Sequence, residues 1–152
     1  MARFFHIAAR PVAVALAFTF VAGIAHGEDQ DVIDYRQRIM KTLNEQAEII
    51  GMILSKVIPT DNTAAHIETM AITASTALKA FEPKVPGGEA KPEVWSKWPD
   101  FSKRMTEFAT KTANAAKAAK QSGPQAGLLI MTDTDLCKGC HDTYRQEETK
   151  KR

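Results

Sequence analysis

The chain has 152 residues, of which 44% are hydrophobic and 25% charged, a composition typical of one compact globular domain. This excludes a multidomain enzyme and a disordered chain, and a formal net charge of +2 is too small for a nucleic-acid-binding protein. No paired carboxylates and no Ser/His/Asp arrangement indicate an active site, so we expect a protein that is not an enzyme.

The first 27 residues are typical of a secretory signal peptide. Residues 1–10 carry two arginines and no acid, residues 12–24 form an apolar run, and Ala25-His26-Gly27 closes it before an acidic stretch. The run is shorter than the roughly 20 residues of a spanning helix. We expect cleavage after Gly27, with Gly23 as a weaker site, and the alternative to a signal peptide is an uncleaved membrane anchor. The mature chain would have no stable membrane span and, in a bacterium, would be periplasmic.

Export would remove Arg3 and Arg10, which reduces the 20 basic residues to 18 and balances the 18 acidic ones. The mature domain, residues 28–152, is then neutral before any cofactor is counted. It keeps both cysteines, and of the four histidines it keeps His66 and His141.

Apolar residues at steps of three and four predict a first amphipathic helix over Asp31–Ile58, which Pro59 ends. A second helix runs to about Phe81, and residues 82–88, with two prolines and two glycines, break it. The inward positions predicted in the first helix are Arg36, Met40, Leu43, Ala47, Ile50, Leu54 and Val57, and those in the second are Ile67, Met70, Ala74, Ala77, Leu78 and Phe81.

A loop with a short turn at 92–95 leads to a third helix that begins at Pro99 and ends before Gly123-Pro124. A fourth helix is predicted over Gln125–Glu147, where Asp133 would face inward and either fray the helix start or accept a hydrogen bond. Four such helices pack most economically as an antiparallel four-helix bundle, so the predicted fold class is all-α.

The chemistry is predicted at Cys137-Lys138-Gly139-Cys140-His141. A Cys-x-x-Cys-His string is the attachment signature of haem c, in which both thiols bond to the porphyrin and the imidazole becomes an iron ligand. A thioredoxin-like redox pair would need a βαβ context, and a disulfide between helical positions three apart would be strained. A zinc site would lack one of its four ligands. The motif therefore predicts one covalent haem c, with its iron, per chain.

Three segments resemble the cytochrome c-prime family, the class II c-type cytochromes. They are Cys-Lys-Gly-Cys-His-Asp-Thr-Tyr-Arg at 137–145, Lys-Pro-Glu-Val-Trp-Ser at 91–96 and Tyr-Arg-Gln-Arg-Ile-Met at 35–40. The resemblance covers essentially the whole mature chain. It implies a four-helix bundle that holds haem close to the C-terminus, and often a homodimer formed through the first two helices.

The resemblance also implies the roles of three further residues. Arg36 would meet a haem propionate, Met40 would lie at the distal side of the iron, and Arg145 would lie near the haem. Family members with Met at the distal position are low-spin electron carriers. We therefore expect a periplasmic mono-haem carrier of single electrons between partner proteins, with His141 and Met40 as axial ligands. The alternative is a five-coordinate, high-spin protein that binds nitric oxide or carbon monoxide.

Overall fold

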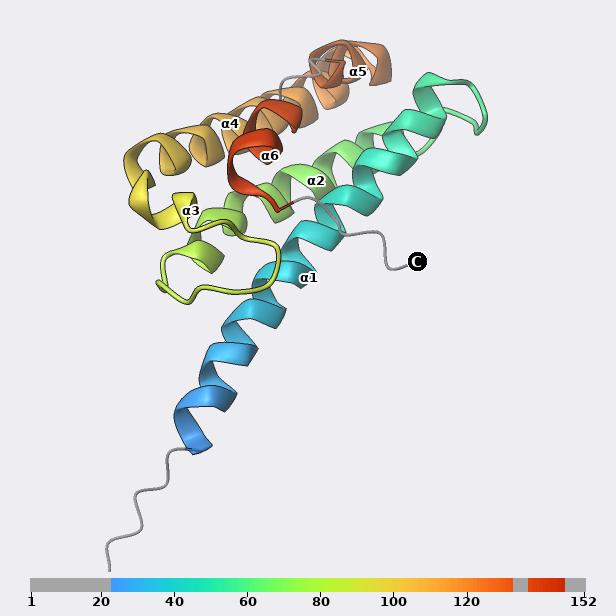
Figure 1. The fold of residues 1–152 in the computed structure, drawn as a ribbon. Coiled ribbons are helices and arrows are strands. Elements are labelled where there is room, and N and C mark those ends of the chain that lie inside the picture. The colour runs from blue at the N-terminus through green and yellow to red at the C-terminus, as the bar shows by residue number, and fades with distance from the viewer. Residues whose placement is uncertain (1–22, 133–136, 147–152) are drawn as a thin grey trace, which may run out of the picture.

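The computed structural model describes residues 23–132 and 137–146, which form a bundle of helices (Figure 1). Consecutive long helices run antiparallel, α2 packs between α1 and α4, and α5 packs against α4. Two short helices, α5 and α6, together take the place of the fourth helix. The predicted all-α four-helix bundle is confirmed. The elements are α1 (Gly23–Leu54), α2 (Thr63–Ala77), the 3-10 helix η1 (Leu78–Phe81), α3 (Glu93–Ser96), α4 (Trp98–Ser122), α5 (Pro124–Met131) and α6 (Lys138–Tyr144).

Helix α1 begins earlier than predicted, at Gly23 instead of Asp31. Its N-terminal turns extend past the rest of the bundle (Figure 1). The expected cleavage point after Gly27 falls within this helix, whereas residues 1–22 of the expected signal peptide lie outside the described residues. Over the described part of the chain, no helix is both long and apolar enough to cross a membrane.

The C-terminal end of α1 differs from the prediction because the helix closes at Lys56. The Lys56 N–H donates to the Ile53 carbonyl and the Val57 N–H to the Met52 carbonyl, with Lys56 in the left-handed region at φ 59°. This is the hydrogen-bond pattern of a Schellman motif, which more often uses glycine. The predictions that Leu54 and Val57 face inward are wrong: they are 41% and 67% exposed, and Ile53 is buried instead.

The inward positions predicted for the second helix are confirmed, with Leu78 only half-buried. The same steps of three and four predict the inward positions of the third helix, which are also confirmed, with Phe108 only half-buried; they are Phe101, Met105, Phe108, Thr112, Ala115 and Ala119. Helix α5 approaches α4 and α2 closely at Gly127. A Cβ atom there would lie 2.7 Å from the Ala119 Cβ and 2.9 Å from the Ile67 Cδ1. Near the other end of α4, the Phe101 ring packs against Phe81 and against Tyr144 of α6, with centroids 4.9 and 5.1 Å apart.

The prediction of one continuous helix over Gln125–Glu147 is wrong. Helix α5 ends at Met131, and the Thr132 N–H closes its last turn by donating to the Leu128 carbonyl at 3.1 Å. Helix α6 ends at Tyr144 because Arg145 is extended and forms a β-bridge with Ala90. The predicted roles of Asp133 fall outside the described residues.

Candidate haem site

A cavity of about 860 Å³ lies between α1, α4 and α6, with further walls from α2, η1 and the loop before α3. Apolar side chains make up much of its lining, which suits a large, flat, mostly apolar group. They are Met40, Leu43, Ala47, Met70, Phe81, Ala90, Val94, Phe101, Met105 and Phe108. The cavity brings together all the site residues predicted from the sequence: Arg36, Met40, Cys137, Cys140, His141 and Arg145.

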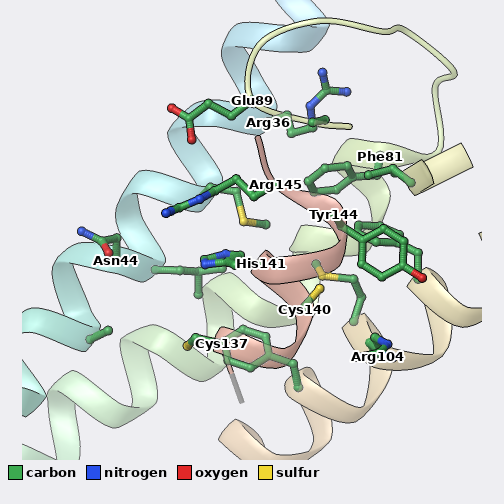
Figure 2. A pocket seen from close by; sticks show the side chains of 18 of the residues that line it. Arg36, Asn44, Phe81, Glu89, Arg104, Cys137, Cys140, His141, Tyr144 and Arg145 are labelled. Atoms are coloured by element: carbon green, nitrogen blue, oxygen red, sulfur yellow. The ribbon is translucent and has the colours of Figure 1, made fainter. Parts of the chain in front are cut away.

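Helix α6 presents the two cysteines and the histidine on one wall (Figure 2). Cys137 precedes the helix and its carbonyl accepts a hydrogen bond from the His141 N–H at 3.0 Å, which places both thiols within the same turn as the imidazole. Both cysteines are free thiols. Among residues 23–132 and 137–146, no cluster of three or more His, Cys, Asp or Glu could hold a metal ion, so these residues supply no zinc site.

The electrostatics of this wall favour uncharged groups. Burial raises the pKa of the Cys137 and Cys140 thiols above the ordinary cysteine value. Burial, together with the nearby Arg145 charge, lowers the pKa of His141. This shift favours the neutral imidazole, which is the form that binds a metal.

Helix α1 forms the opposite wall. Met40 is half-buried and lines the cavity from this helix, one turn after Arg36. Asn44, one turn further along, also lines the cavity, and its amide Nδ2 donates to the Glu48 carboxylate of the same helix at 2.6 Å (Figure 2). At one end of the cavity the same view shows three charged side chains, Arg36, Arg145 and Glu89. Arg145 is the C-cap residue of α6: its N–H donates to the His141 carbonyl at 2.9 Å, and its own backbone is extended.

Arg36 is only 3% exposed although it is charged. Its Nη1 and Nη2 donate to the carbonyls of Val85 and Gly87 at 3.2 and 2.9 Å, so the side chain fastens the loop before α3 to α1. The guanidinium also lies 5.3 Å from the Phe81 ring centroid and 5.2 Å from that of Trp95. Burial lowers the pKa of Arg36. No carboxylate pairs with it among the described residues, and two of its five N–H donors are used.

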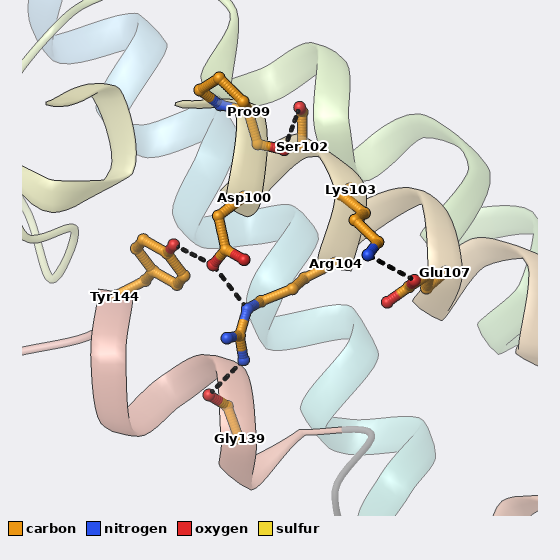
Figure 3. A network of polar contacts seen from close by, with 8 residues as sticks. All are labelled: Pro99, Asp100, Ser102, Lys103, Arg104, Glu107, Gly139 and Tyr144. Atoms are coloured by element: carbon orange, nitrogen blue, oxygen red, sulfur yellow. Dashed lines mark hydrogen bonds and ion pairs between the residues drawn. The ribbon is translucent and has the colours of Figure 1, made fainter. Parts of the chain in front are cut away.

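A polar network between α4 and α6 was not predicted from the sequence (Figure 3). The Tyr144 hydroxyl donates to Asp100 at 2.5 Å, the Arg104 Nε donates to the same carboxylate oxygen at 2.7 Å, and the Arg104 Nη1 donates to the Gly139 carbonyl at 3.0 Å. The hydrogen bonds from Tyr144 and Arg104 lower the pKa of Asp100. Burial and the bond to Asp100 raise the pKa of Tyr144 to about 12. The acid-to-arginine spacing of four residues within α4 was the available sequence signal.

The loop before α3 is also joined to α6. The Lys91 N–H donates to the Tyr144 carbonyl at 2.9 Å, and the Lys91 Nζ donates to the Asp142 carbonyl at 3.1 Å. The Gln146 N–H donates to the Glu89 carbonyl at 2.8 Å, beside the bridge between Ala90 and Arg145. These bonds hold the C-terminal end of α6 in place.

A helical bundle with two free thiols and a neutral imidazole on the wall of one large, mostly apolar cavity is the architecture of a c-type haem protein. The family model described as Cytochrome C' matches residues 31–145, which is most of the chain. The chain belongs to the cytochrome c' family, and its cofactor is haem c.

Three similar proteins illustrate the range of the family. Cytochrome c' of Pararhodospirillum photometricum is 31% identical over 123 residues, with 75% of this chain and 95% of that protein covered. Cytochrome c-556 of Rhodopseudomonas palustris is 25% identical over 148 residues, with 91% and 98% covered. The solved structure of cytochrome c prime from Shewanella frigidimarina superposes with a TM-score of 0.68 at 25% identity, with 78% and 97% covered.

Proposed function

We propose that this protein is a periplasmic carrier of single electrons whose haem iron is ligated by His141 and Met40. The observation that carries the proposal is that both side chains line one cavity, His141 from α6 and Met40 from α1. A neutral imidazole and a thioether on opposite elements are the ligand pair of electron-transfer cytochromes c.

The residues of the cavity fit a covalently bound haem. Cys137 and Cys140 would hold the porphyrin from α6, because both thiols lie within the turn that also carries His141. The apolar side chains from α2, α4 and η1 would exclude water from its faces. Haem supplies one-electron chemistry at its iron, with a potential that His/Met ligation raises.

Charged groups of this chain are placed to receive the polar edge of the cofactor. Arg36 has guanidinium N–H groups beyond the two that bind Val85 and Gly87, and it lines the cavity. Arg145 lies at the same end and is exposed (Figure 2). We assign both to the propionates, for which arginine is the preferred partner.

Export and assembly complete the proposal. Residues 1–27 would direct secretion and be removed, because haem c attachment takes place after export and the segment has the pattern of a signal peptide. Partner proteins would exchange electrons with the haem. A homodimer through α1 and α2 would cover exposed apolar side chains on both helices, among them Met52 and Ile72, which are 42% and 62% exposed.

Membership of the cytochrome c' family favours a second candidate function. In this alternative the iron is five-coordinate and high-spin, and it binds nitric oxide or carbon monoxide on the side of Met40. Met40 would then only crowd the distal space as an apolar side chain.

The test is the substitution Met40→Leu, with Met52→Leu as a control on the exposed part of the same helix. We expect low-spin optical and EPR spectra for the wild type and for M52L, and a five-coordinate high-spin iron that binds carbon monoxide rapidly for M40L. A wild-type protein that is already high-spin in the ferric state at neutral pH would support the gas-binding alternative. A low-spin M40L protein would show that another residue is the ligand.

A further inference from the structure

Helix α6 carries the wall of the site that holds both thiols and the imidazole, yet it has only seven residues. Isolated helices shorter than about 12–15 residues are marginal in water. The orientation of His141 toward the cavity therefore depends on contacts that α6 makes with the rest of the bundle.

Helix α4 holds α6 at two points (Figure 3). Arg104 binds the Gly139 carbonyl near the start of α6, and Asp100 binds the Tyr144 hydroxyl at its end. The Arg104 Nε also binds Asp100, which joins the two points through one ion pair. We call Asp100, Arg104, Gly139 and Tyr144 the α4–α6 clamp.

The two points of the clamp lie on either side of His141 along α6. A helix held at one point can still rotate about its axis or slide, whereas one held at residues 139 and 144 has both movements restricted. The planar guanidinium of Arg104 suits this task, because it donates to Asp100 and to Gly139 from different nitrogens at 2.7 and 3.0 Å.

The clamp is better suited to positioning than to global stability. The side chains of Arg104 and Asp100 are 40% and 50% exposed. Exposed ion pairs contribute little to the free energy of unfolding because water and salt screen them. The directional hydrogen bonds to α6 therefore distinguish this pair from an ordinary surface pair such as Lys103 and Glu107, whose ion pair joins two residues of α4 (Figure 3).

We propose that Arg104, held by Asp100, is a positioning residue that fixes the orientation of His141 toward the haem iron and thereby tunes the reduction potential of the iron. The inference rests on the proposed attachment at Cys137 and Cys140 and on His141 as a ligand. It adds Arg104, which lies outside the Cys-x-x-Cys-His motif and acts on the motif through its hydrogen bond to the Gly139 carbonyl.

The experiment compares holoproteins that carry Arg104→Gln, Arg104→Lys, Tyr144→Phe and the control Lys103→Gln. The readouts are the reduction potential and the optical and EPR spectra, recorded well below the melting temperature of each variant. R104K keeps the charge but loses the planar fork, so the proposal predicts that R104K and R104Q both shift the potential and the spectra by more than K103Q. Y144F removes one point of the clamp but keeps the ring packed on Phe101, so it should give a smaller shift of the same kind.

The proposal is overturned if R104K has the wild-type potential and spectra and R104Q shifts them no more than K103Q does. The shift in R104Q would then follow from the loss of one positive charge and not from the loss of the hydrogen bond to α6. If the R104 variants do not fold, Y144F decides: unchanged potential and spectra overturn the proposal. The proposed function fails separately. The mass of the wild-type holoprotein tests whether haem is covalently attached, and its spin state tests whether Met40 ligates the iron. The clamp variants are compared with the wild type, so their comparison is valid whether the wild type is low-spin or high-spin.

Discussion

Replacing Arg36 with leucine tests the physical account of the site most directly, because this side chain is buried, charged and without a carboxylate partner among the described residues. R36L removes two charge-assisted hydrogen bonds, to the Val85 and Gly87 carbonyls, and the contacts with the rings of Phe81 and Trp95.

The magnitude follows from opposing terms. A hydrogen bond to a charged group contributes about 1.5–3 kcal/mol and a desolvated cation–π contact about 2 kcal/mol, whereas burying the guanidinium offsets a large part of that gain. We expect R36L to lower the free energy of unfolding by about 3 kcal/mol, since two loop carbonyls also lose their donors. For a chain of this length that corresponds to a fall in melting temperature of roughly 6–12 °C.

The assay is thermal unfolding of the holoprotein followed by circular dichroism at constant pH. The matched control is Arg38→Leu, because Arg38 is an exposed arginine on the same helix. We expect the control to melt close to the wild type. If R36L melted within about 2 °C of R38L, the reasoning that Arg36 fastens the loop to α1 would be refuted. Arg36→Lys refines the test, because lysine keeps the charge near a propionate but loses the planar fork, so it should recover less than half of the lost stability.

Two further predictions concern packing and pH. Gly127→Ala should destabilise the bundle by about 1–2 kcal/mol in denaturant unfolding, because overpacking against Ala119 outweighs the helix propensity gained from alanine. Gly51→Ala, where a Cβ meets nothing within 4 Å, should not destabilise it, and equal effects of the two changes would contradict the packing account. Hydrogen bonds from Tyr144 and Arg104, with the charges of Arg104 and Lys103, lower the pKa of Asp100 from its usual 3.8. Its contribution to stability is therefore present above that value and is lost as the pH falls through the lower folded value. Asp100→Asn should remove this contribution to the fall of melting temperature with decreasing pH. If the variant and the wild type lost melting temperature equally in acid, Asp100 would be excluded as the source of that contribution.

The sequence predicted those parts of the fold that depend on one helix at a time. Periodicity identified the buried faces of α2 and α4, and Pro59, the segment 82–88 and Gly123-Pro124 separated the elements. The Cys-x-x-Cys-His string predicted the haem because its residues are close in the chain. Periodicity could not predict the end of α1. That end depends on the left-handed conformation of Lys56, which is uncommon for a lysine.

Pairings between distant segments were beyond the reach of the sequence pattern. The end of α6 is set by the bridge from Arg145 to Ala90, and the contact of Tyr144 with Asp100 spans 44 residues. Arg36 was recognised as a charge on an apolar face, but its carbonyl partners lie 49 and 51 residues away in the loop before α3. Such contacts depend on how the elements pack, and a single sequence carries no periodic signal for them.

The loop over residues 85–91 connects the two walls of the haem site. Arg36 fastens one end of it to α1, one turn from Met40, and Lys91 fastens the other end to α6 through the Tyr144 carbonyl. The separation between the walls that carry Met40 and His141 is therefore set partly by a loop that belongs to neither α1 nor α6. Loss of the Arg36 contacts should consequently affect both stability and iron ligation, whereas loss of the α4–α6 clamp should affect mainly ligation, because its ion pair is exposed.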